Sequence, residues 1–475
     1  MISTIKNSFI TFLSLTVLFS CSKDFLELKP TDAIEENEVF TNYNNARAAL
    51  IGAYDQLSSP NFGGLYNPIM SDIMGEDLMI NSVDNWNWFT QVYQMNVLPT
   101  YTYVDAPWWS GYKLAYDVNK IVENAQSIPG ASQEEMNELE GQARALRAYV
   151  HLKLVQMYSQ AYKRNPNALS IMEADRILGI DEEDLGRSTV QNTYEFIASD
   201  LLKSLELLTD LDQDEFDQGF FSKRGAYALL ARTYLDIGEW EMARDYAQMA
   251  HKDLDLMSIN DMYAGFMFRN SETIYAIAYT QEDNNIYLSL PSFYWPVAGY
   301  SSMRANDKFV EKFSNDDARA GFFLMEPEID ENRHLILKFG HNAVVGNAER
   351  IVIRASEMHL IEAECEAELG NYSKAQDALY LIQSRSYPGV RKSTNTGQEL
   401  IDEILLERRK ELFGEGFRWN DIKRRQLPFV REGNHWVKFN FTSNDPDYYR
   451  MTFPIPQSEI DANSNISEAD QNEGY

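Results

Sequence analysis

The sequence is poor in features that would identify several large classes of protein. It has only two cysteines in 475 residues, Cys21 and Cys365, too few for a disulfide framework. The apolar run over residues 9–20 is shorter than the about 20 residues that a helix needs to cross a bilayer. Its formal net charge is −30, and the sequence contains no block of five lysines or arginines. Such a surface repels nucleic acids and polyanions.

Catalytic and metal-binding motifs are also missing. The sequence has no Gly-x-Ser-x-Gly, His-Glu-x-x-His or Gly-x-x-x-x-Gly-Lys motif. Its six histidines are scattered, and His334 and His341 lack metal-ligand spacing. Among 72 acidic residues no glycosidase pair stands out, and the alternating Glu362, Glu364, Glu366 and Glu368 are expected mostly to face solvent. We therefore predict a protein that is not an enzyme and has no metal site or cofactor.

The N-terminus has the pattern of a secretory signal. Lys6 precedes the apolar run, and no acidic residue occurs before Asp24. The run ends in Leu-Phe-Ser-Cys, which resembles the lipobox of bacterial lipoproteins; the alternative is an ordinary signal with an incidental cysteine. The resemblance implies that residues 1–20 are removed and Cys21 is acylated, for example with palmitate. The following Ser-Lys-Asp resembles a tag for the outer face of the outer membrane, so we expect a lipid-anchored protein facing the cell exterior.

Two stretches of 30 residues, 225–254 and 356–385, share a helical-repeat pattern. In each, small residues recur at helix-contact spacing around a glycine, Gly238 in the first and Gly370 in the second. This spacing is typical of tetratricopeptide repeats, in which two helices pack closely across a short turn. We predict a helical-repeat scaffold over about 110–255 and 355–425. Trp109, Tyr112 and Tyr116, at i, i+3 and i+7, are predicted to face the core.

Long irregular insertions interrupt this scaffold. They cover about residues 58–107 and 258–354, are rich in aromatic residues and asparagine, and contain short β-prone pieces such as ETIYAIAYT and HLILKFG. Insertions of this length on a repeat scaffold usually carry function. The predicted fold is mostly α with minor β, and residues 21–475 are predicted to form one domain.

Three segments, in this order, resemble signatures of the SusD/RagB family of outer-membrane lipoproteins: RSTVQNTYEFIASDL, EILLERRKELFGEGFRWNDIKR and FPIPQSEIDAN with the final QNEGY. The resemblance covers nearly all of the mature chain. In the second segment, Glu407, Arg408, Glu411 and Asp421 are suited to a buried ion-pair network. The resemblance implies a SusD-like fold and a non-enzymatic protein that binds a nutrient, usually a glycan. It also implies a partner, a SusC-like TonB-dependent transporter, which the protein covers as a lid with its repeat face towards it.

Two aromatic clusters are the candidate ligand-binding site. The first contains Asn81, Asp84, Trp86 and Trp88, and the second Tyr294, Trp295, Tyr300 and Arg304. Sugar rings stack their CH faces on aromatic rings, while their hydroxyls need amide, carboxylate or guanidinium partners. We predict that the two loops converge on one shallow surface away from the repeats. The acidic charge favours a neutral oligosaccharide or polysaccharide. Two alternatives stay open, a peptide or other nutrient on the same scaffold, and a lid without ligand affinity of its own.

Overall fold

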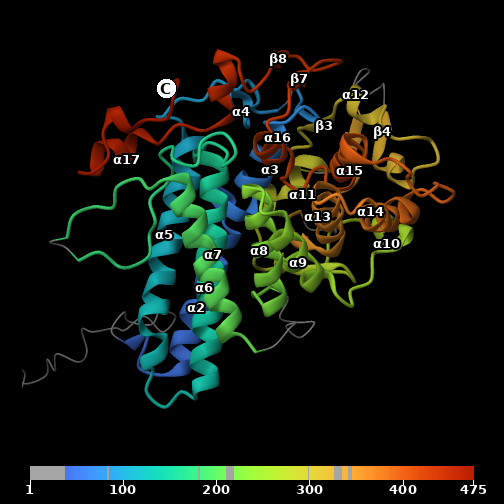
Figure 1. Cartoon of the computed structure of the whole chain (residues 1–475). Helices are drawn as coiled ribbons and strands as arrows, with labels where there is room; N and C mark the ends of the chain where they lie inside the picture. Colours follow the sequence, from blue (N-terminus) through green and yellow to red (C-terminus); the bar gives the residue numbers. More distant parts are fainter. Residues whose placement is uncertain are drawn as a thin grey trace, which may run out of the picture.

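The computed structural model describes residues 38–82, 85–179, 182–209, 219–297, 299–325, 334–340 and 345–475. Cys21 and Asp84 lie outside these ranges. Helices make up most of the described chain, and the irregular segments gather around one end and one side of them (Figure 1), which confirms the mostly α prediction. Among the described residues, no helix has both the length and the apolar character to cross a bilayer.

The first half of the chain supplies the longer helices. They are α2 (Tyr43–Ser58), α3 (Tyr66–Ile73), α4 (Thr90–Tyr93), α5 (Thr102–Asn124), α6 (Gln133–Tyr158) and α7 (Val190–Leu207). Helix α6 begins with a capping box in which Ser132 and Glu135 each satisfy the other's backbone N–H group. Helix α5 packs on α6, and α6 on α7, as three neighbouring long helices (Figure 1).

The predicted repeats are two helix pairs that the structure brings together. They are α8 (Lys223–Ile237) with α9 (Trp240–His251), and α13 (Ala355–Glu368) with α14 (Tyr372–Ser386). Gly238 and Gly370 take left-handed φ angles of 81° and 78° at the turns, where a glycine avoids backbone strain. Helix α9 packs directly on α13. The two repeats are therefore neighbours in space, although about a hundred residues separate them in sequence.

The remaining helices are shorter or follow the second repeat. They are α10 (Ile259–Ala264), α11 (Leu290–Tyr294), α12 (Asp307–Val310), α15 (Gly397–Glu411), α16 (Arg418–Arg425) and α17 (Gln457–Ala462). Helix α15 packs on α13 and α14 and extends the scaffold. The C-terminal segment with α17 crosses the end of the long helices (Figure 1).

Short strands occur in the insertions and near the C-terminus. One sheet has the order β1 (Leu78–Ile80), β3 (Met303–Ala305), β5 (His334–Ile336), β4 (Phe323–Met325). Two antiparallel pairs join β2 (Thr273–Ile277) to β6 (Arg350–Arg354), and β7 (Phe429–Arg431) to β8 (Phe439–Phe441). The β-prone pieces in the second insertion contain β2 and β5, as predicted.

The predicted stripe on α5 is wrong at two of its three positions. Trp109 is 62% exposed and Tyr116 41% exposed, whereas Tyr112 is half-buried and donates from its hydroxyl to the Met172 carbonyl. The buried face of α5 instead carries Val104, Trp108, Gly111, Leu114, Ala115 and Val118. This row also fits helical spacing. Only the position of the neighbouring helices decides whether this row or the predicted one is buried.

The ion-pair network predicted around α15 is confirmed and is larger than expected. Glu411 accepts from Arg319, Arg354 and Arg385 at 2.9, 2.8 and 2.5 Å. These three guanidinium groups outweigh burial and hold the pKa of Glu411 well below its usual range. Arg408 pairs with Asp421 at 2.9 Å. The network joins α14, α15, α16 and the second insertion, so it holds the scaffold and its loops together.

The four alternating glutamates of α13 do not mostly face solvent, which corrects the prediction. Glu364 and Glu366 are fully buried. Glu364 accepts from both terminal nitrogens of Arg424, at 2.6 and 2.8 Å. A buried carboxylate is tolerated when an arginine of a neighbouring helix pairs with it, and that arginine lies 60 residues away in the sequence.

Candidate functional site

The two aromatic loops meet because their flanking strands pair. Strand β1 runs antiparallel to β3, with Ile80 opposite Met303. The backbone N–H of Asn81 donates to the carbonyl of Ser302 at 2.7 Å. In an antiparallel pair, the end of one strand lies beside the start of the other. The loop after β1 and the loop before β3 therefore leave the sheet at the same end and lie side by side. That they form one shallow surface away from the repeats stays a prediction.

The rings of Trp88, Phe89, Tyr287, Phe293 and Tyr300 form one cluster. Together with the exposed Trp86, two residues before Trp88 in the chain, we call this cluster the aromatic platform. The ring of Trp88 lies 5.7 Å from that of Phe293 and 5.5 Å from that of Tyr300, centroid to centroid. Tyr287 continues the row at 6.0 Å from Tyr300. Phe89 and Phe293 are buried, whereas Trp88 and Tyr300 are half-buried. The two phenylalanines thus form a buried base for the rings of Trp88 and Tyr300, each of which has a polar group at its edge.

Trp86 is the most exposed ring of the platform, at 76%. It sits in a turn in which Trp86, Asn87 and Phe89 all have left-handed φ angles of 54–63°. Residues other than glycine rarely adopt this backbone conformation, and strained backbone of this kind clusters at functional sites. Asn85 fixes the turn, because its Oδ1 accepts from the Asn87 N–H at 2.8 Å and its Nδ2 donates to Thr90 Oγ1 at 3.2 Å. The turn therefore holds Trp86 out towards solvent.

Tyr287 is a platform residue that sequence reasoning missed. It is 53% exposed and follows Ile286, whose φ angle is +48°. Asn284 Oδ1 accepts from the Ile286 N–H at 2.8 Å, and Asn285 Nδ2 donates to the Ser58 carbonyl at 2.8 Å. The sequence held a signal, since the segment NNIY mixes amides with an aromatic ring in the same way as the two chosen clusters.

Two predicted contact residues lie inside the protein, which corrects their expected role. Tyr294 is fully buried and its hydroxyl donates to Asp72 Oδ2 at 3.2 Å, because α11 turns it away from the surface. Arg304 is 4% exposed and its Nη1 donates to the carbonyls of Ser301 and Met303 at 2.6 and 2.9 Å. Neither offers a surface to a ligand on the platform, and both position the loop before β3.

The other predicted residues differ in what they can contribute. Asn81 and Trp295 are half-buried at the bases of their loops. Tyr300 is held by Gly299 and Ser292: its backbone N–H donates to Ser292 Oγ at 3.2 Å, and a Cβ atom at Gly299 would lie only 2.5 Å from that oxygen. Gly299 has a φ angle of +86°. Only a glycine lets this turn approach Ser292 so closely.

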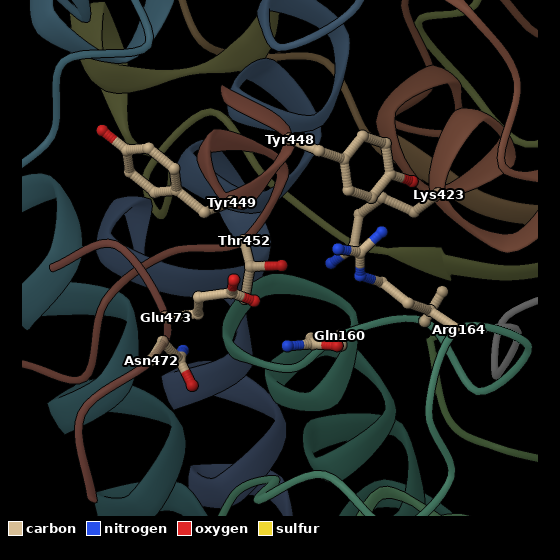
Figure 2. A pocket seen from close by; sticks show the side chains of 9 residues that line it. Gln160, Arg164, Lys423, Tyr448, Tyr449, Thr452, Asn472 and Glu473 are labelled. Atoms are coloured by element: carbon tan, nitrogen blue, oxygen red, sulfur yellow. The ribbon is translucent and has the colours of Figure 1, made fainter. Parts of the chain in front are cut away.

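A small polar hollow lies apart from the platform (Figure 2). Its volume is about 20 Å³, enough for one water molecule but not for a sugar ring. Arg164 lies over the ring of Tyr448 at 4.8 Å, and Figure 2 shows Gln160 beside them with Thr452, Asn472 and Glu473 across the hollow. Lys423 donates to the carbonyls of Gln156 and Ser159 at 2.6 and 2.9 Å, and burial lowers its pKa to about 7. The Lys423 bonds therefore join α16 to the end of α6, and the Arg164 contact joins the C-terminal segment to the loop after α6.

A larger groove, of about 590 Å³, runs beside α7 and α8 on the helical scaffold. It is open and mixes apolar with charged side chains, namely Tyr162, Gln191, Tyr194, Glu195, Ala198, Ser199, Leu202, Lys203, Glu206, Tyr234, Ile237 and Glu239. Leu202 is 39% exposed within it. Three tyrosines line the groove, and tyrosine is enriched at contacts between proteins.

Family models match two parts of the chain. Residues 336–475 match the model described as "SusD family", and residues 24–235 match the one described as "Starch-binding associating with outer membrane". A relative from Formosa agariphila, SusD-like protein P38, is 25% identical over 88% of this chain and 91% of its own length.

Solved structures share the fold. A SusD superfamily protein from Bacteroides thetaiotaomicron matches with a TM-score of 0.80 and 25% identity, over 91% of this chain and 99% of that one. Surface glycan-binding protein A from the same species, in complex with laminarihexaose, matches with a TM-score of 0.71 and 20% identity, over 89% and 98% of the two chains. The latter likeness concerns the fold alone.

Proposed function

This chain belongs to the SusD/RagB family, and on that premise we propose that it binds a glycan on the aromatic platform and delivers it to a SusC-like TonB-dependent transporter. Proteins of this family bind carbohydrate without catalysis, which confirms the expected non-enzymatic role. The observation that carries the proposal is the 76% exposed ring of Trp86, held in a strained turn two residues before Trp88, whose ring packs against that of Tyr300.

The platform has the chemistry that a sugar chain requires. Trp86 and Tyr287 present exposed rings for the CH groups of a pyranose, and the ring of Tyr287 packs against that of Tyr300. The exposed Asn87 amide and the tyrosine hydroxyls can bond sugar hydroxyls at the ring edges. The relative solved with laminarihexaose carries its glycan on the same fold, which supports a glycan as the ligand here.

The proposed ligand is a neutral oligosaccharide or polysaccharide. The net charge of −30 disfavours an acidic chain at the surface. Arg304, the basic residue predicted beside the site, is buried and already donates to two backbone carbonyls. The platform is therefore suited to stacking and neutral hydrogen bonds.

The proposed location is the outer face of the outer membrane, with an acyl anchor on Cys21. The family is described as associated with the outer membrane, which supports the location. The lipobox-like sequence that ends at Cys21 supports the anchor. Replacing Cys21→Ala should release the protein from the membrane fraction or leave an unprocessed precursor. Normal acylation and surface retention of this variant would contradict the proposal.

The groove beside α7 and α8 is the proposed contact for the transporter, since the repeat face is the one expected to turn towards it. Leu202→Glu should reduce co-purification of the SusC-like transporter while leaving glycan affinity unchanged. Ile51→Glu is the matched control, because Ile51 is an exposed aliphatic residue of α2, 47% exposed. An equal loss of co-purification in both variants would show that the groove is not the specific contact with the transporter.

The central test is a binding screen with the purified mature chain. Neutral glycans, acidic glycans and peptides are titrated by isothermal calorimetry, and the best ligand is then tested against Trp86→Ala. We expect a neutral glycan to bind and the variant to weaken it. Tight binding of a peptide instead would favour the alternative nutrient, and absence of binding across the screen would favour a lid without its own affinity.

A further inference from the structure

The contact between the two repeats contains a group of side chains that the glycan site does not use. His251 is the last residue of α9, and His359 and Glu362 lie one turn apart on α13. Residues three apart on a helix face the same side, so both side chains of α13 point towards the end of α9. The packing of α9 on α13 thus brings two imidazoles and one carboxylate together.

The three side chains are close enough to share one ion. His251 Nε2 and Glu362 Oε2 are 2.7 Å apart, and the two histidine rings stack with centroids 3.8 Å apart. One ligand atom from each residue lies within 4.8 Å of the others. Two ligand atoms on a tetrahedral zinc ion are about 3.3 Å apart, given bond lengths of about 2.0–2.1 Å. Closing the group around an ion therefore takes side-chain adjustments of roughly 1–2 Å.

One ring nitrogen in the group is unsatisfied. Among the residues that the structure describes, Nδ1 of His359 has no hydrogen-bond partner, although it is buried. Buried polar groups normally have hydrogen-bond partners, so an exception calls for an explanation such as an ion.

The carboxylate is oriented by a further neighbour. Gln248, one turn before His251 on α9, donates from Nε2 to Glu362 Oε1 at 2.7 Å. This bond leaves Oε2 directed at His251. Outer partners of this kind hold ligating groups in place in metal sites.

We propose that His251, His359 and Glu362 bind one divalent cation of the zinc class between the two repeats. Two imidazoles with one carboxylate suit zinc and its neighbours among the transition metals, whereas calcium and magnesium prefer oxygen ligands alone. Water would complete the coordination. The sequence predicted no metal site, because His251 and Glu362 are 111 residues apart and only folding joins them.

The ion would clamp the base of the second insertion. The chain leaves the scaffold after His251, at the end of α9, and returns to it at α13. The segment between them carries Tyr287, Phe293 and Tyr300 of the aromatic platform. A metal that ties α9 to α13 fixes both ends of this segment, so we assign it a structural role.

Cobalt titration tests the proposal, with the mature chain expressed without a histidine tag and stripped with a chelator. Visible absorption reports Co²⁺ bound by nitrogen and oxygen ligands, and calorimetry then measures displacement by Zn²⁺. We expect one Co²⁺ per chain, displacement by Zn²⁺, and a Zn²⁺-dependent rise in Tm of a few degrees.

Variants locate the ion. His359→Ala and the near-isosteric Glu362→Gln should each weaken Co²⁺ binding about 100-fold or more and abolish the Zn²⁺-dependent rise in Tm. His334→Ala is the control, since His334 is a half-buried histidine of β5, and it should bind as the wild type does. The absence of a Co²⁺ spectrum at millimolar concentration would overturn the proposal. An unchanged spectrum in both variants would also overturn it, because it would show an adventitious ion only. Glycan titration of the same variants tests the proposed function independently, so a failure of metal binding does not count against glycan binding.

Discussion

Replacing Trp86→Ala tests the aromatic platform most directly, because the proposed site uses this side chain and folding depends little on it. Its ring is 76% exposed, so its removal should change the free energy of unfolding by less than about 0.5 kcal/mol. One stacking contact with a sugar is expected to be worth about 0.5–1.5 kcal/mol by analogy with aromatic pairs. This range corresponds to a weakening of glycan affinity by about 2- to 12-fold.

The assay combines isothermal calorimetry with thermal unfolding, and uses two comparison variants. Trp109→Ala on α5 removes a ring of similar exposure, 62%, and should alter neither affinity nor Tm. Trp88→Ala should weaken binding and also lower Tm, because its half-buried ring packs against Phe89, Phe293 and Tyr300. Wild-type affinity in Trp86→Ala, for a glycan that the wild type binds, would refute the placement of the site. An equal loss in Trp109→Ala would show that the effect is not local.

Three further predictions concern electrostatics. Glycan affinity should change less than about twofold between 50 and 300 mM salt, since a neutral ligand has no charge to screen, and a steep loss would indicate an acidic glycan. Burial raises the pKa of the Asp72 carboxyl to about 8, whereas in the unfolded chain that pKa is 3.8, so between these values only the folded state keeps the proton. The free energy of unfolding therefore falls as pH rises from about 4 to 8. The Tm of Asp72→Asn should exceed that of the wild type by more at pH 9 than at pH 5. An equal gain at both pH values would contradict that assignment. Glu411→Gln leaves the buried Arg319, Arg354 and Arg385 without their shared carboxylate and should cost about 3–5 kcal/mol in chemical denaturation, whereas Lys113→Ala, which breaks an exposed pair with Asp117, should cost less than about 0.5 kcal/mol.

The repeats were predictable from the sequence because their signals are local. A tetratricopeptide pair needs small residues at helix-contact spacing and a residue that tolerates a left-handed turn, and Gly238 and Gly370 supply the turns. The ion-pair network around Glu411 was partly predictable for a similar reason, since charged residues in an otherwise helical segment need partners. Its arginine partners outside that segment, Arg319, Arg354 and Arg385, were not, because they come from other elements.

The general place of the platform was also predictable, whereas its membership was not. Aromatic residues mixed with asparagines in irregular segments indicated where to look. The pairing of β1 with β3 then decided that the loops meet, and α11 decided that Tyr294 is buried. Residue type carries no information on which way a short buried helix turns its side chains, so Tyr294 and Arg304 were chosen and Tyr287 was missed.

By itself, the sequence determined the periodic helices, the turns between them and the composition of the insertions, because spacing along one chain is enough to specify each of these. Only the tertiary structure decided which faces are buried. Helix packing exposed Trp109 and buried Glu364 against Arg424, and the contact of α9 with α13 brought His251 to His359 and Glu362. Burial and charge pairing depend on what lies across the contact, and that neighbour is usually distant in the sequence.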